Sequence, residues 1–255
     1  MKQGDFTNLA KQYANRPSYS NFLLKNLLKV INYSELKNDF SVVEVGAGTG
    51  KLTKMLLEMN LHVIAVEPND QMREQGILYT KNFSNVKWLK GSGEKTNLET
   101  SIANWVIMAS SFHWTDPKKS LPEFGRILKK DGYFTAIWNT RNIEISDFHK
   151  KIENEIKRIV PELQRVSSGS QSTKKWEYII TSTNDFENCL FMETDYNENM
   201  SKDRYLGAWK SVNDIQAQAG EKRWGDIIKM IENEISLLDN IDVPYKIRSW
   251  TCKKV

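Results

Sequence analysis

Hydrophobic and polar positions alternate along this chain with two periods, one typical of buried strands and one typical of helices. Short apolar runs rich in β-branched residues predict strands at 41–45, 61–66, 86–90, 103–109 and 133–138. Between them, apolar residues spaced three and four positions apart predict helices at 51–59, 70–79 and 117–128. Strands that alternate with helices of this length predict a parallel, doubly wound α/β sheet, whose ligands lie at the carboxyl ends of the strands.

The segments on either side of this core predict further helices and two more strands. Residues 6–32 predict helix with a break at Pro17, because a proline biases the preceding residue away from the helical conformation. Beyond residue 142 the pattern predicts helices at 146–160, 202–209 and 222–238, strands near 189–194 and 245–252, and a polar loop at 166–173.

A glycine-rich turn, Glu44–Val45–Gly46–Ala47–Gly48–Thr49–Gly50, joins the first strand to its helix. Glycines permit positive φ and close approach of backbone to a ligand, and the helix N-terminus offers free N–H groups. The turn is neither a dinucleotide fingerprint nor a P-loop, because Lys51 replaces the third glycine and Leu52 replaces the required serine or threonine. It suits a ligand with an amino-acid head and an adenosine tail; a purely structural turn is the alternative.

An acid ends the second predicted strand. Glu67 precedes Pro68 at the position where nucleotide-binding sheets hold ribose hydroxyls. A carboxylate can accept both hydroxyl protons, which predicts a ribose contact. The alternative is an acid that stabilises the N-terminus of the next helix.

Composition narrows the functional classes. The formal charge is only +4 over 255 residues and no basic stripe is interleaved with aromatics, so we expect no nucleic-acid partner. The two cysteines, Cys189 and Cys252, are far apart and lack C-x-x-C spacing, so we expect small apolar residues near strands, without a metal site or a disulfide framework. The first residues lack an apolar leader and no stretch reaches transmembrane length, which predicts a cytoplasmic protein without a membrane partner.

Together with the glycine turn and Glu67, three further segments carry a family resemblance. They are Ser92–Gly93–Glu94, Phe112–His113–Trp114, and the N-terminal group Tyr13, Arg16–Pro17 and Tyr19. On these residues the chain resembles the class I S-adenosylmethionine-dependent methyltransferases, and within them the small-molecule branch that includes trans-aconitate methyltransferase. The resemblance covers about residues 6–142. Ser20 and Asn104 depart from the pattern of the branch, which often has a proline and an acid there.

The resemblance implies one methyltransferase domain over residues 1–255. Its fold would be a Rossmann-like doubly wound, mostly parallel seven-stranded sheet with helices on both faces and added N-terminal and C-terminal helical cap elements. Its parts would be an N-terminal helical flap (6–40), a cofactor-binding core (41–142) and, on the acceptor side, a cap insertion with the last strands (143–255).

The implied cofactor is S-adenosyl-L-methionine, with S-adenosyl-L-homocysteine as product and no metal. Its binding residues would be Arg16, Glu44, Gly46, Ala47, Gly48, Gly50, Glu67, Pro68, Met72, Ser92, Gly93, Glu94, Ser110, Ser111 and Phe112. The resemblance places the glycine turn against the methionine part, Glu44 near its ammonium group and Glu67 on the ribose. It places Met72 on the adenine face and Glu94 at the adenine edge, with Arg16 or the loop after strand four near the carboxylate.

His113 is the candidate catalytic residue, either as a base or as a group that orients the acceptor. The alternative is a hydrogen-bonded loop residue that lines the cofactor. The expected reaction is methyl transfer to an O, N or C nucleophile of a small-molecule acceptor, a carboxylate being one option. Candidates for the acceptor pocket are Trp138, Arg141, Trp176, Tyr205 and Trp209.

Two other functions stay open. One is a non-catalytic, regulatory protein that binds S-adenosylmethionine. The other is an NAD(P)-type oxidoreductase, which Lys51 disfavours because it occupies the position of the third glycine. Monomer and homodimer are both open.

Overall fold

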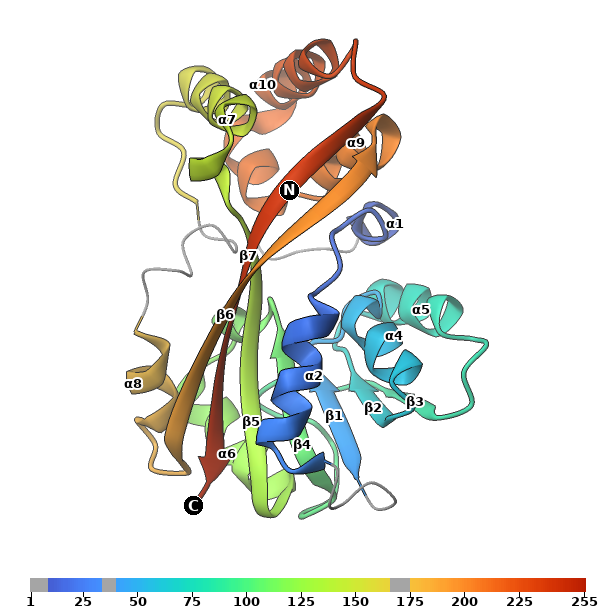
Figure 1. The fold of residues 1–255 in the computed structure, drawn as a ribbon, viewed down its shortest axis with the longest axis vertical. Helices are drawn as coiled ribbons and strands as arrows, with labels where there is room; N and C mark the ends of the chain where they lie inside the picture. The colour runs from blue at the N-terminus through green and yellow to red at the C-terminus, as the bar shows by residue number, and fades with distance from the viewer. Residues whose placement is uncertain (1–8, 34–39, 166–174) are drawn as a thin grey trace. The chain divides into compact units, whose positions relative to one another are not determined.

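The computed structural model describes residues 9–33, 40–165 and 175–255. The chain divides into two compact units (Figure 1). The first, which we call the core unit, comprises Ser18–Asn139, Thr173–Thr194 and Ile247–Val255. The second, which we call the helical unit, comprises Met1–Pro17, Thr140–Ser172 and Asp195–Lys246. The predicted assignment of flap, cofactor core and acceptor side stays a prediction.

One seven-stranded sheet runs through the fold in the order β3-β2-β1-β4-β5-β7-β6. Its strands are β1 (Ser41–Val45), β2 (His62–Val66), β3 (Val86–Leu89), β4 (Ala103–Ala109), β5 (Leu128–Arg141), β6 (Phe186–Ser201) and β7 (Asn240–Lys254). The pairs β1–β2, β1–β4, β2–β3 and β4–β5 are parallel, and Glu44 of β1 lies opposite Ala65 of β2 and Ile107 of β4. The prediction of a Rossmann-like, mostly parallel seven-stranded α/β sheet is confirmed.

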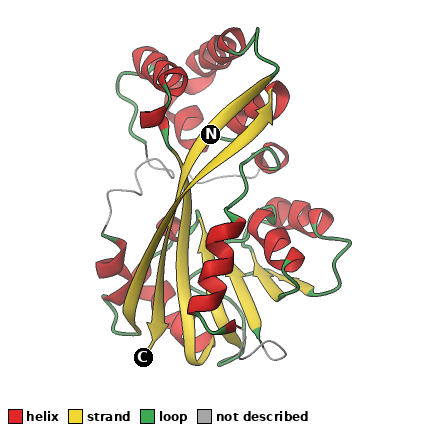
Figure 2. Ribbon diagram, in the orientation of Figure 1, coloured by secondary structure: helices red, strands yellow, loops and turns green. Residues whose placement is uncertain are grey.

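In the core unit, helices cover both faces of the sheet, as Figures 1 and 2 show for α2 in front and α6 behind. The helices of this unit are α2 (Asn21–Val30), α4 (Lys51–Glu58), α5 (Asp70–Tyr79), α6 (Pro117–Ile127) and α8 (Trp176–Thr181), with the 3-10 turn η2 (Phe112–Trp114). Val43 and Val45 of β1 pack in one core cluster with Phe124 of α6 and Trp176 of α8. The alternate residues of β1 face the other way, where Leu24 and Leu27 of α2 are fully buried.

Several boundaries differ from the predicted ones. Helix α6 ends at Ile127 and β5 begins at Leu128, so Asp131–Gly132 lies within the strand and does not end the helix. Strands β6 and β7 are much longer than predicted, and most side chains of β6 are exposed or half-buried. β6 lies at the edge of the sheet, where charged side chains are tolerated and an apolar run is not required.

The helical unit contains α1 (Ala10–Tyr13), the 3-10 turn η3 (Ile143–Ile145), α7 (Asp147–Ile159), α9 (Lys202–Lys210) and α10 (Asn213–Glu234). Its core joins apolar residues of α7, α9 and α10, among them Ile152, Trp209 and Ile227. Gly220 interrupts α10 with φ 73° and ψ 170°, which explains why the pattern predicted a helix only from 222. The break predicted at Pro17 is confirmed, since α1 ends before it and α2 begins after Ser20.

The two cysteines form a disulfide within the core unit, with their Cα atoms 4.2 Å apart. The expectation that they are unpaired is therefore wrong, because the pairing of β7 with β6 brings together residues separated by 63 positions. The location of both cysteines in strands is confirmed.

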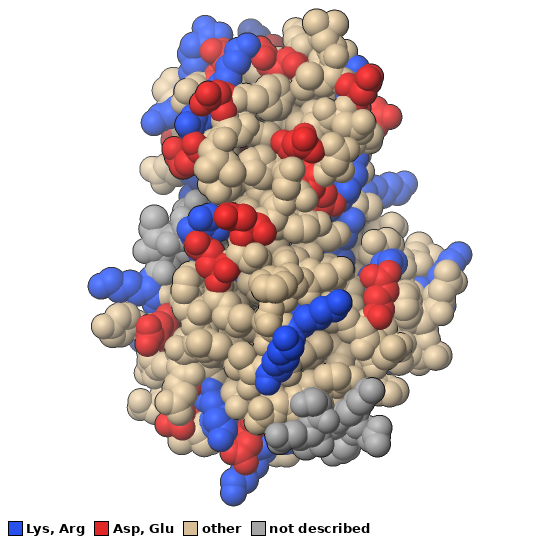
Figure 3. Space-filling view, in the orientation of Figure 1, with Lys and Arg blue, Asp and Glu red and all other residues tan. Residues whose placement is uncertain are grey.

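Three further findings bear on the predicted partners. No helix in the described part of the chain is long and apolar enough to cross a membrane. Acidic and basic side chains are intermingled on the face shown in Figure 3. The described ranges hold no group of three or more histidine, cysteine, aspartate or glutamate side chains suited to a metal. The loop predicted at 166–173 lies outside the described residues.

Candidate functional site

Three glycines in the left-handed conformation form the turn after β1. Gly46, Gly48 and Gly50 have φ angles of 69°, 57° and 79°, a region that costs an ordinary residue about 1–2 kcal/mol. The N–H groups of Gly46 and Ala47 donate to the Val66 carbonyl at 2.8 and 3.1 Å, which ties the turn to the end of β2. Gly50 is the N-cap of α4, so the predicted strand–turn–helix unit is confirmed.

The space around two of these glycines differs. A Cβ at Gly46 would lie 2.7 Å from Ser111 Oγ, which itself donates to the Val45 carbonyl at 3.2 Å. Gly46 is therefore required by the close approach of the loop after β4. Among the described residues, a Cβ at Gly48 would meet only the methyl group of Met72, at 3.5 Å. Gly48 and Met72 thus bound a space that the backbone leaves open.

Glu44 is a buried acid beneath the turn. Its side chain is 1% exposed, and Thr53 Oγ1 of α4 donates to its carboxylate at 2.5 Å. Burial raises the pKa of Glu44 to about 8, with a smaller increase from the negative charge of Glu67, while the bond from Thr53 opposes the shift. A cation bound beside Glu44 would favour the ionised form, which fits the predicted contact with an ammonium group.

Glu67 follows β2 and joins two segments of the site. Its Oε2 accepts the N–H of Gly48 at 2.8 Å, and its Oε1 accepts the N–H of Asn69 at 3.0 Å. Burial raises its pKa, and the two backbone hydrogen bonds oppose that shift. Each oxygen keeps a second lone pair, so the carboxylate can still accept two hydroxyl groups. Pro68, next in the chain, is exposed.

The loop after β3 packs against the start of α6. The Ser92 N–H donates to the Lys95 carbonyl at 2.9 Å, and a Cβ at Gly93 would lie 2.6 Å from Thr115 Cγ2. Glu94 Oε1 accepts the N–H of Asp116, the N-cap of α6, at 2.9 Å. Glu94 therefore has a structural bond that the sequence did not predict, and its role at an adenine edge stays a prediction.

The loop after β4 brings the predicted serines to the turn. Ser110 has φ 52°, and its hydroxyl is 2.9 Å from the Tyr19 hydroxyl of the N-terminal segment. Phe112 is fully buried, with its ring 5.2 Å from that of Phe134 and 5.5 Å from that of Trp176. The Phe112 side chain is thus part of the core, and the role of Phe112 at the cofactor stays a prediction.

Part of the chain is similar in sequence to known proteins. Residues 43–136 match the family described as the methyltransferase domain. An uncharacterized methyltransferase of Mycobacterium tuberculosis is 36% identical over 101 residues, 40% of each chain. One of Schizosaccharomyces pombe is 30% identical over 137 residues, 53% of this chain and 52% of that one. Residues 43–136 thus resemble a methyltransferase domain.

A solved structure from Anaeromyxobacter dehalogenans, provisionally described as a type II methyltransferase, shares the fold of the methyltransferase domain. Its TM-score is 0.65 at 17% identity, and the match covers 93% of this chain and 97% of that one. The M. tuberculosis relative is matched over only about two fifths of its length. The trans-aconitate branch stays a prediction.

His113 is oriented by Trp138, which the sequence analysis placed only among the candidates for the acceptor pocket. The Trp138 indole N–H of β5 donates to His113 Nδ1 at 3.1 Å. Trp138 in turn stacks on Trp176, with ring centroids 4.3 Å apart and planes at 21°. Trp138 and Trp176, two of the five predicted acceptor-pocket residues, therefore contact each other in the core unit, and Trp138 also contacts His113.

The other three predicted pocket residues cluster in the helical unit. The Arg141 guanidinium lies 4.1 Å from the centroid of the Trp209 ring and 5.9 Å from that of Tyr205. The His149 ring centroid lies 6.0 Å from that of Tyr205. Arg141 Nε, His149 Nε2, Tyr205 Oη and Trp209 Nε1 are buried and have no hydrogen-bond partner among the described residues. Burial raises the pKa of the Tyr205 hydroxyl, and the neighbouring Arg141 and Trp209 oppose that shift.

Arg16 also lies in the helical unit. Its Nε donates to Ser211 Oγ at 2.5 Å and its Nη2 to the Ser211 carbonyl at 2.9 Å, while the guanidinium covers the Tyr13 ring at 4.8 Å. These contacts fix the side chain within its own unit. The predicted role of Arg16 at a cofactor carboxylate stays a prediction.

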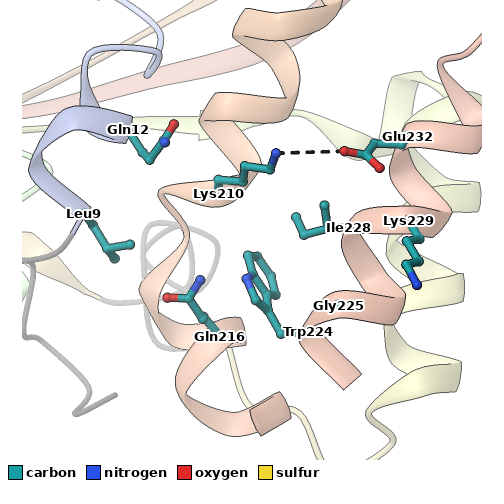
Figure 4. A pocket seen from close by; sticks show the side chains of 9 residues that line it. All are labelled: Leu9, Gln12, Lys210, Gln216, Trp224, Gly225, Ile228, Lys229 and Glu232. Carbon is teal, nitrogen blue, oxygen red and sulfur yellow. Dashed lines mark ion pairs between the residues drawn. The ribbon is translucent and has the colours of Figure 1, made fainter. Parts of the chain in front are cut away.

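The helical unit also has an open hollow of about 610 Å³ (Figure 4). It is lined by Leu9, Gln12, Lys210, Gln216, Trp224, Gly225, Ile228, Lys229 and Glu232. Lys210 and Glu232 form an ion pair of 3.8 Å across it. None of these residues was predicted to belong to a site.

Proposed function

We propose that this protein is an S-adenosylmethionine-dependent methyltransferase that acts on a small-molecule acceptor and forms S-adenosylhomocysteine. One observation carries the proposal: the two buried carboxylates of Glu44 and Glu67 flank a turn of left-handed glycines at the ends of β1 and β2. When bound, the cofactor supplies a methyl group activated by a positively charged sulfur.

The residues of this edge fit such a ligand. Glu44 offers a buried carboxyl group that an adjacent ammonium group would ionise, and Glu67 offers further lone pairs for two ribose hydroxyls. The open space at Gly48, bounded by Met72, admits a ligand close to the backbone. The chain's task is then to bind, orient and exclude water, since positioning alone removes much of the barrier to such a transfer.

We further propose that the acceptor carries a carboxylate. A carboxylate is ionised at neutral pH and is itself the nucleophile, so its methylation requires no general base.

Measurements of ligand binding and methyl transfer distinguish the proposed methyltransferase from two other functions. A non-catalytic regulatory protein would bind S-adenosylhomocysteine but transfer no methyl group. An oxidoreductase would bind NADH, which Lys51 opposes by placing a side chain where that site needs glycine. Cytoplasmic location, the absence of nucleic-acid, membrane and metal partners, and the choice between monomer and homodimer stay predictions.

The deciding experiment is calorimetric titration with S-adenosylhomocysteine, with NADH as the comparison ligand. We expect binding of the first and none of the second. Absence of S-adenosylhomocysteine binding would contradict the proposed function.

The acceptor class is tested by release of S-adenosylhomocysteine in the presence of trans-aconitate, succinate and benzoate, against amines and phenols of similar size. Turnover with a carboxylate supports the proposed acceptor. Turnover confined to amines or phenols would contradict the carboxylate.

A further inference from the structure

The hollow of about 610 Å³ lies within the helical unit and is lined by residues from α9, α10 and the segment around α1 (Figure 4). Sites for small molecules in proteins have volumes of roughly 300–1,000 Å³, so the hollow has room for a small metabolite. Glu44, Glu67 and the glycine turn belong to the core unit. The hollow therefore shares no residue with the proposed cofactor site.

Two glycines of α10 shape the hollow. Gly220 has φ 73° and interrupts the helix, so Gln216 and Trp224 lie on two separate helical segments and line the same space (Figure 4). Gly225 also lines it, and a Cβ there would meet no atom of the described residues within 4 Å. A glycine inside a helix is less stable than alanine by about 0.5–1 kcal/mol. Helix stability therefore does not explain Gly225, whereas an open volume beside it does.

One part of the lining is apolar. It consists of Leu9, Trp224 and Ile228, and the last two pack against the core of the helical unit. Figure 4 shows the side chains of Trp224 and Ile228 pointing into the same space. An indole ring packs well against aliphatic chains and other aromatic rings. This part of the hollow therefore favours a ligand with a large apolar group.

The other part of the lining holds two opposite charges. Lys210 Nζ of α9 lies 3.8 Å from a carboxylate oxygen of Glu232 on α10, and Figure 4 marks this ion pair. The two side chains are 40% and 46% exposed, and exposed pairs contribute only about 0–1 kcal/mol. A ligand can therefore replace this pair at small cost if it offers a negative group to Lys210 and a positive group to Glu232.

We propose that the hollow is a binding site for an α-amino acid with a large apolar side chain. Its carboxylate and ammonium groups are attached to one carbon atom, so they can face Lys210 and Glu232 together while the side chain packs on Trp224. An apolar monocarboxylate or a simple amine would satisfy only one of the two charges. The inference goes beyond the proposed methyltransferase function and does not depend on it.

Calorimetric titration of the wild-type protein without cofactor tests the site. The ligands are L-phenylalanine, L-tryptophan, L-leucine and L-methionine, each compared with its deaminated and decarboxylated analogues, such as phenylpropionate and phenylethylamine for phenylalanine. We expect at least one amino acid to bind with a Kd below about 1 mM, and both of its analogues to bind about tenfold more weakly or worse. Binding of none of the four, or equal binding of an analogue, would overturn the inference.

A charge variant tests the contact with the ammonium group. In Glu232→Gln we expect the affinity for the amino acid to fall about tenfold, because a hydrogen bond between charged groups is lost, while the affinity for the deaminated analogue does not fall. Glu221→Gln, exposed on the same helix and outside the lining, is the matched control and should bind as wild type does. An equal loss for both ligands in Glu232→Gln would contradict the role of Glu232.

A filling variant tests the location. Gly225→Leu puts a side chain into the open volume, and we expect the affinity for the amino acid to fall about tenfold or more, while circular dichroism shows a folded protein. A folded Gly225→Leu protein with wild-type affinity would overturn the inference. The outcome is independent of the cofactor titration: a protein that binds the amino acid but not S-adenosylhomocysteine would contradict only the proposed function.

Discussion

The carboxylate of Glu67 accepts the backbone N–H of Gly48 at 2.8 Å. The acid at the end of β2 therefore fixes the glycine turn after β1 as well as facing the ligand edge. Its second oxygen accepts the N–H of Asn69 at 3.0 Å, at the start of α5. One side chain thus connects the three segments that surround the proposed ribose position.

Replacing Glu67 is expected to weaken cofactor binding and to loosen the turn. In Glu67→Gln, the amide NH₂ would face one of two backbone N–H donors, and Glu67→Ala would leave both without their acceptor. We expect S-adenosylhomocysteine affinity to fall by about 1–3 kcal/mol in either variant, as measured by calorimetry. Glu58→Gln, on the exposed side of α4, is the control. Wild-type affinity in Glu67→Ala would remove this residue from the site.

Glu44 is expected to make stability depend on pH. Its pKa is about 8 in the folded protein and near 4.5 when exposed, so between these values the folded state binds more protons than the unfolded state. Stability from this group is full below pH 4.5 and is lost as pH rises through 8, by up to roughly 5 kcal/mol. Urea unfolding at pH 5.5 and 8 should show the fall, and Glu44→Gln should reduce it. An equal fall in the free energy of unfolding between pH 5.5 and 8 in Glu44→Gln would contradict the raised pKa of Glu44.

Binding of S-adenosylhomocysteine is expected to release a proton through Glu44. Free Glu44 is protonated at pH 6.5 because its pKa is raised to about 8, and a ligand ammonium beside it would stabilise the ionised form. Titrations in phosphate and in Tris, which differ in ionisation enthalpy, should reveal release of up to about one proton. Glu44→Gln provides the reference, and equal heats in the two buffers for wild type would speak against an ammonium at Glu44.

Two Gly→Ala substitutions are expected to change stability in opposite directions. Gly46→Ala forces a Cβ to within 2.7 Å of Ser111 Oγ at a φ of 69°, which we expect to cost about 2–4 kcal/mol. Gly225→Ala, inside α10, meets no atom within 4 Å and should stabilise by about 0.5–1 kcal/mol. Thermal unfolding checks both. Wild-type stability in Gly46→Ala would contradict this prediction and show that the loop after β4 moves to accommodate the Cβ.

The helical unit is expected to depend on Arg165. Its Nε donates to Asp214 at 3.1 Å and its Nη1 to Glu153 at 2.9 Å, and the Asp214 side chain is fully buried. Arg165→Met would leave that acid without this cation, which we expect to cost about 2–4 kcal/mol in chemical denaturation. Arg158→Met, in an exposed pair, should change little. Equal free energies of unfolding for Arg165→Met and Arg158→Met would contradict a stabilising role for the ion pairs of Arg165.

The sequence predicted the elements whose cause is local. The strand–glycine–helix unit at residues 41–58 follows from apolar periodicity and from glycines that alone take positive φ without strain. Only residues 189–194 of the edge strand β6 were predicted, because the remainder of the strand is mostly polar and half-exposed and gives a weak apolar signal. Thr53, which bonds Glu44, was also missed, because a threonine within a helix carries no sign of the acid nine positions earlier that it contacts.

By itself, the sequence determined the α/β class, the glycine turn and the position of Glu67 at the end of a strand, because strand and helix periods and turn chemistry act over a few residues. Tertiary structure decided the bond from Trp138 to His113, the pairing of Cys189 with Cys252, and the burial of Phe112. These depend on contacts among residues far apart in the chain, which are set by strand pairing and side-chain packing. The hydrogen bond to the candidate catalytic residue therefore follows from the fold and not from the motif that contains this residue.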